Sequence, residues 1–151
     1  MTRSRSLRPM GTRDMNPTAT TNPALASGVL KHQHADHIVF GIPHTDYELH
    51  LQVDEPPDLE PGKPLRGRIF AQALRIDKAR SGGRYIEPIY GRPRRLQGRI
   101  VATEPATNTI TVHCGCPIQC VLGPRQQISM FDVGDFVTFD IERGARFVPI
   151  Q

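Results

Sequence analysis

The residues between 78 and 95 combine six basic side chains with two of the three tyrosines of the chain and a single acid. Guanidinium groups bind phosphates and release counterions, and a tyrosine ring can stack on an unpaired base. This composition is typical of a single-strand binder. We therefore predict a nucleic-acid interface, for single-stranded RNA or DNA, made of Lys78, Arg80, Arg84, Tyr85, Tyr90, Arg92, Arg94 and Arg95.

The same segment also has a purely structural interpretation. Tyr85 and Tyr90 could anchor a surface loop to the core, with the arginines simply solvated. The sequence alone does not decide between these two interpretations.

Five of the six histidines lie between His32 and His50. Within them, residues 32–37 read His-x-His-x-Asp-His, which resembles the metal-binding motif of the metallo-β-lactamase superfamily. The resemblance implies a dinuclear zinc site in which Asp36 positions the attacking water. The resemblance covers these six residues only. The domains of that superfamily are longer than this chain, and they take further metal ligands far downstream of the motif. We expect no hydrolase, and metal binding through His32–His37 stays a remote alternative.

The three cysteines follow His113 as Cys114, Cys116 and Cys120. Zinc sites usually place two residues between paired cysteines and add a second pair, which this spacing lacks. We predict three buried thiols, with metal binding through Cys114–Cys120 as the second remote alternative. The odd count also favours a reducing cytoplasm. The chain offers no nucleophile triad or phosphate-binding glycine loop, so we predict no enzyme and no cofactor.

The composition indicates which elements carry these residues. Glycine and proline supply 27 of the 151 residues, which disfavours helices. Apolar residues alternate with polar ones from 46 to 53, as in a half-buried strand. Further strands are predicted at 37–42, 65–76, 96–103, 109–114, 118–122, 136–142 and 146–150, with a hairpin turn at 104–108 and at most one helical turn within 124–131.

A short repeat runs through two of these strands. Residues 65–71 and 96–102 share the pattern Leu-x-Gly-Arg-Ile-x-Ala. A glycine inside a strand usually marks a bulge or a tight bend. We therefore predict an all-β fold, a small OB-like or SH3-like barrel of about six to eight short strands.

The chain divides into a tail and one domain. Residues 1–34 are predicted to be a disordered basic and polar tail, because their composition offers little apolar surface to bury. Residues 35–151 are predicted to form a single β-barrel domain. No apolar run has the length of a membrane span, so we expect no membrane association.

The formal charge of +4 conceals two opposed segments. Residues 38–62 hold six acids and no Lys or Arg, while residues 63–99 hold eleven bases and two acids. Such segregation suggests a polyanionic partner. The alternatives are that the two segments neutralise each other in the fold, or that the acidic 46–60 segment pairs with a basic surface of a protein partner or of a second copy.

Overall fold

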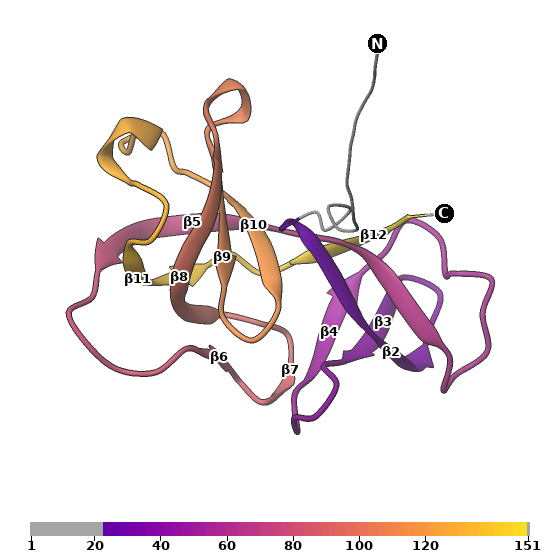
Figure 1. Ribbon diagram of the computed structural model, residues 1–151. Helices are drawn as coiled ribbons and strands as arrows, with labels where there is room; N and C mark the ends of the chain where they lie inside the picture. Colours follow the sequence, from indigo (N-terminus) through magenta and orange to yellow (C-terminus); the bar gives the residue numbers. More distant parts are fainter. Residues whose placement is uncertain (1–22, 151) are drawn as a thin grey trace, which may run out of the picture.

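The computed structural model describes residues 23–150, which form strands joined by turns and short 3-10 helices (Figure 1). The all-β prediction is confirmed. The strands are β2 (Leu25–Gln33), β3 (His37–Gly41), β4 (Glu48–Gln52), β5 (Pro64–Lys78), β6 (Tyr85–Glu87), β7 (Tyr90–Gly91), β8 (Arg95–Glu104), β9 (Thr109–His113), β10 (Pro117–Val121), β11 (Phe136–Ile141) and β12 (Arg146–Pro149).

The long strand β5 organises the whole sheet (Figure 1). Its first half pairs with β2 and β12, its middle pairs with β10, and its second half pairs with β11. The pairings therefore follow two closed circuits that share β5. One runs β5, β2, β3, β4, β12, and the other runs β5, β10, β9, β8, β11. The OB-like or SH3-like barrel stays a prediction.

The eight strands expected from periodicity are all present, and three more accompany them. The additions are β2, β6 and β7, so the described chain holds eleven strands instead of six to eight. The hairpin turn at 104–108 is confirmed: η3 (Pro105–Thr107) joins β8 to β9, and Asn108 adopts the left-handed conformation with φ 51°. The expected helical turn is η4 (Ile128–Met130).

The boundary of the predicted tail requires a correction. Residues 25–33, assigned to the tail, form β2 and pair with both β3 and β5. The buried residues of this strand are Ala26, Gly28 and Leu30, which face the interior of the protein. Because small residues give little apolar periodicity, the sequence pattern does not reveal the strand at 25–33. The rest of the predicted tail, residues 1–22, lies outside the described residues.

One apolar core runs through both circuits. In β4 the alternation predicted from the sequence is confirmed, because Leu49 and Leu51 are fully buried while His50 and Gln52 face outward. Phe40 packs against Phe147, with ring centroids 5.5 Å apart. Each large side chain buried in this way contributes about 1.5–3 kcal/mol to folding.

The glycines of the repeated pattern lie close against the backbone of the strand paired beside them. A Cβ at Gly67 would collide with the backbone of β12 at Val148, and a Cβ at Gly98 would collide with the backbone of His113. Register shifts occur at other positions, between Leu30 and His32, between Ile100 and Ala102, and between Phe139 and Ile141. The glycines therefore permit close backbone approach, which is the other common use of a strand glycine.

Candidate nucleic-acid interface

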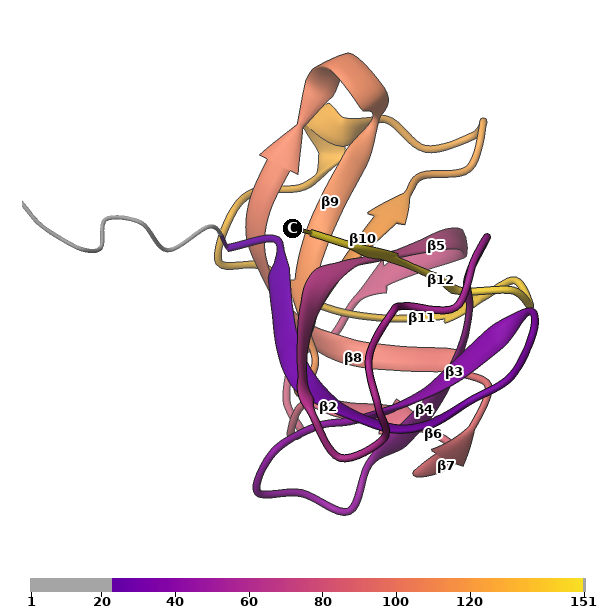
Figure 2. The same cartoon turned by 90° about the vertical axis from the view of Figure 1, so that its right-hand side faces the viewer.

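The segment from 78 to 95 is fixed to both circuits. It leaves the end of β5, pairs with β8 through β6, pairs with β4 through β7, and then enters β8. In the parallel pairing of β7 with β4, Tyr90 lies opposite Glu48. Figure 2 shows β4, β6 and β7 close together at one end of the molecule. Some of the predicted site residues therefore lie on short strands, and the others lie in the loops between them.

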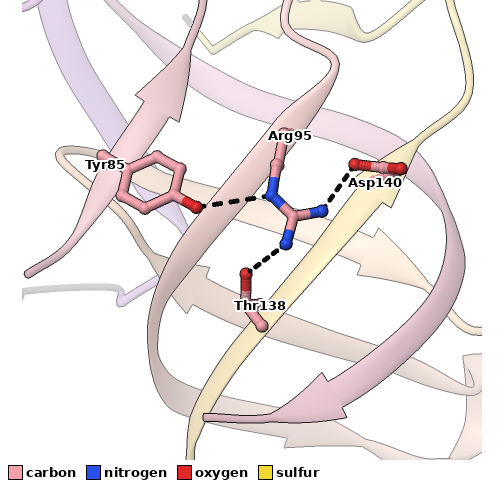
Figure 3. A network of polar contacts seen from close by, with 4 residues as sticks. All are labelled: Tyr85, Arg95, Thr138 and Asp140. Atoms are coloured by element: carbon pink, nitrogen blue, oxygen red, sulfur yellow. Dashed lines mark hydrogen bonds and ion pairs between the residues drawn. The ribbon is translucent and has the colours of Figure 1, made fainter. Parts of the chain in front are cut away.

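Three of the predicted residues are engaged in contacts within the protein. Arg95 donates from Nε to the hydroxyl of Tyr85 at 3.3 Å, from Nη1 to Asp140 at 2.8 Å and from Nη2 to Thr138 at 3.1 Å (Figure 3). The hydrogen bonds that Arg95 donates to Asp140 and then to Tyr85 raise the pKa of Arg95. This network joins β6, β8 and β11. Lys78 forms an ion pair with Asp135 at 3.3 Å.

The other five predicted residues form what we call the open set: Arg80, Arg84, Tyr90, Arg92 and Arg94. All five are exposed, and Tyr90 keeps 61% of its surface accessible. Within residues 23–150, none of the four arginines has an ion-pair partner. Arg84 Nη1 lies 3.2 Å from His113 Nδ1. Burial, followed by the charge of Arg84, lowers the pKa of His113, so its neutral ring accepts this hydrogen bond.

Tyr90 also ends a row of aromatic rings that crosses β3 and β4. The rings of His34 and His37 stack at 4.4 Å between centroids, and those of His37 and His50 at 5.9 Å. The ring of Tyr90 meets His50 edge-on at 4.7 Å. We call His34, His37, His50 and Tyr90 the ring row. Sequence reasoning treated the histidines only as metal ligands and missed this link, which depends on the pairing of β4 with β7.

Burial and the nearby positive charges lower the pKa of His50 from its ordinary value of 6.5, which favours a neutral ring near pH 7. Burial, then the charges of His37, Arg92 and His34, lower the pKa of His50, whereas Glu48 opposes this shift. The Nε2 atom of His50 is buried without a hydrogen-bond partner. His37 Nδ1 lies 2.9 Å from a carboxylate oxygen of Asp36, and this contact is the main cause of the lowered pKa of Asp36.

The cysteines are buried, as predicted. Cys114 and Cys120 are fully inaccessible and Cys116 nearly so. Burial raises the pKa of Cys114 to about 12 and those of the other two thiols well above the ordinary range. In the part of the chain that the structure describes, no three His, Cys, Asp or Glu side chains are arranged to hold a metal ion. His32–His37 and Cys114–Cys120 therefore provide no geometry for a metal centre among these residues.

The acidic segment and the basic segment do not neutralise each other through ion pairs in the described structure. Asp54, in the acidic segment, contacts Arg146 Nη2 at 2.9 Å through both carboxylate oxygens. Over residues 23–150, no ion pair joins the acids of 46–60 to a base of 63–99. The open set therefore presents positive charge that the acidic segment does not pair.

Comparison with protein-family models, with curated proteins and with solved structures gives no match for this chain. The described residues contain no helix with the length and apolar character needed to cross a membrane.

Proposed function

We propose that the protein is a non-enzymatic module that binds single-stranded nucleic acid, RNA or DNA, through the open set. The observation that carries this proposal is the group of four exposed arginines, Arg80, Arg84, Arg92 and Arg94, without ion-pair partners in the described chain and close in sequence to an exposed Tyr90. Arginine forks suit phosphate oxygens, and an exposed tyrosine suits an unstacked base.

The proposal divides the predicted site residues by role. The four arginines of the open set contact phosphates and Tyr90 stacks on a base. Arg95 and Tyr85 hold β6 against β8 and β11, and Lys78 with Asp135 fixes the start of the segment. These three residues position the site.

The test replaces the four arginines with glutamine and measures binding of a single-stranded uridine oligomer by fluorescence anisotropy at low salt. We expect a loss of at least about tenfold in affinity, because each phosphate contact contributes to the electrostatic part of binding. Arg125→Gln serves as the matched control, since Arg125 is an exposed arginine in the β10–β11 connection. Equal binding by the quadruple variant and the control would refute the proposed site.

The second candidate function is self-association through opposed charges. The exposed acids Asp46, Asp58 and Glu60 have no ion-pair partner among the described residues, and the open set is equally unpaired. A head-to-tail contact between copies would join the two surfaces. Sedimentation velocity over a range of protein concentrations tests this: a salt-sensitive rise in sedimentation coefficient supports it, and a constant monomer value excludes it.

A further inference from the structure

The ring row continues the open set onto neighbouring strands. Tyr90 belongs to both. Arg92 of the open set also acts on the row, because its charge is the third-largest cause of the lowered pKa of His50, after burial and the charge of His37. From Tyr90 the rings pass over His50 of β4 and His37 of β3 to His34 in the turn after β2. The row therefore places three imidazoles beside the proposed path of a nucleic-acid strand.

We propose that the ring row is a proton-coupled phosphate-binding surface that extends this nucleic-acid site. The inference rests on the proposed function. Nε2 of His50 is buried, so the contact with a ligand falls to the ring nitrogens of His34 and His37, which donate to phosphate oxygens when protonated. Asp36 holds Nδ1 of His37, so Nε2 is the nitrogen of His37 left for a ligand.

The groups facing the row explain why protons and ligand should bind together. The positive neighbours are the other imidazoles and Arg92, and the negative ones are Asp36 and Glu48. Burial, and after it the positive charges of His37, Arg92 and His34, lower the pKa of His50 and so disfavour its protonation in the free protein. A phosphate chain alongside would offset the effect of these positive charges and favour the charged rings. Binding should therefore take up protons and strengthen as the pH falls.

The test measures affinity for a uridine oligomer at about pH 7.5 and about pH 5.5 at constant ionic strength, because uridine itself does not titrate in this range. For the wild-type protein we expect affinity to rise on acidification, by up to about tenfold per pH unit for each proton taken up. In the triple variant His34→Gln, His37→Gln, His50→Gln most of this rise should disappear. His32→Gln is the matched control, since His32 is exposed on β2 and outside the row.

A second measurement keeps the test informative if the triple variant does not fold. Calorimetric titration of the oligomer in two buffers of different ionisation enthalpy reports proton uptake directly, and His34→Gln alone alters only an exposed residue of the row. Wild-type uptake that falls in His34→Gln supports the inference. Binding without proton uptake, or with equal uptake in the triple variant, overturns the inference and leaves the proposed function intact. No wild-type binding at about pH 7.5 and low salt refutes the proposed function itself.

Discussion

Tyr85 and Tyr90 lie five positions apart in the sequence, but Tyr85 is half-buried and Tyr90 is exposed. The hydroxyl of Tyr85 accepts a hydrogen bond from Arg95 inside the network of Figure 3, and its ring is half-buried. Tyr90 is largely exposed and touches His50. The anchoring interpretation therefore holds for Tyr85, whereas Tyr90 is exposed, as the proposed binding role requires.

Substituting the two tyrosines separates these roles. Tyr90→Ala should weaken binding of a uridine oligomer by about 1–3 kcal/mol, the usual contribution of one stacked base, with little change in the free energy of unfolding. Tyr85→Phe should leave binding unchanged and lower the free energy of unfolding by about 1 kcal/mol through the lost hydrogen bond. Binding by anisotropy and unfolding by urea give the two quantities. A binding defect confined to Tyr85→Phe would contradict the assignment.

His50 should make folding stability depend on pH. Its pKa in the folded protein lies below the ordinary value of 6.5, with burial as the main cause. The unfolded chain therefore binds more protons than the folded one as the pH falls below about 6.5, and stability declines there. We expect His50→Gln to show a smaller fall in unfolding temperature between about pH 7.5 and pH 5.5. His113, whose pKa is also lowered, should retain part of the fall in that variant. An identical pH dependence in both proteins would contradict this role of His50.

At the scale of elements, the repeated glycines have a specific structural role. Gly67 in β5 lies against the backbone of its paired strand β12, and Gly98 in β8 lies against the backbone at the end of its paired strand β9. The shared pattern Leu-x-Gly-Arg-Ile-x-Ala thus places one close backbone approach in each circuit of strands. Neither residue adopts a positive φ, so the requirement is for space and not for an unusual backbone conformation.

Replacing these glycines with alanine should destabilise the protein. Gly67→Ala and Gly98→Ala each force a methyl group onto backbone atoms, and overpacking of this kind costs about 1–3 kcal/mol. Gly83→Ala is the control, because a Cβ there meets nothing within 4 Å. Urea unfolding compares the three variants. If Gly83→Ala were as destabilised as Gly98→Ala, the close backbone contact at Gly98 would not be the cause of the lost stability.

The elements also show which parts of the fold the sequence could predict. The eight strands predicted from periodicity exist because each carries enough alternating positions to reveal a buried face. β6 and β7 have three and two residues, too few for a period to appear. β2 buries Ala26 and Gly28, whose small side chains carry little signal. The ring row could not be predicted, since it requires the pairing of β7 with β4.

At the scale of the whole molecule, the distribution of charge is the main determinant of the proposed function. The sequence left open whether the acidic and basic segments cancel each other. In the described structure Asp54 of the acidic segment pairs with Arg146, and three bases of the basic segment, Arg75, Lys78 and Arg95, pair with Asp77, Asp135 and Asp140. The four arginines of the open set are among the bases without such a partner, and together they form an exposed positive surface. Such a surface attracts polyanions over distances that salt screening limits to about 10 Å.

The salt dependence of oligonucleotide binding tests this central claim most directly. The affinity of the wild-type protein for a uridine oligomer should fall steeply with salt, with a slope of about 0.7 in log affinity per log salt for each phosphate contact. The variant lacking Arg80, Arg84, Arg92 and Arg94 should lose about 3 from that slope if each contacts one phosphate. A wild-type affinity insensitive to salt, or the same slope in both proteins, would contradict the account.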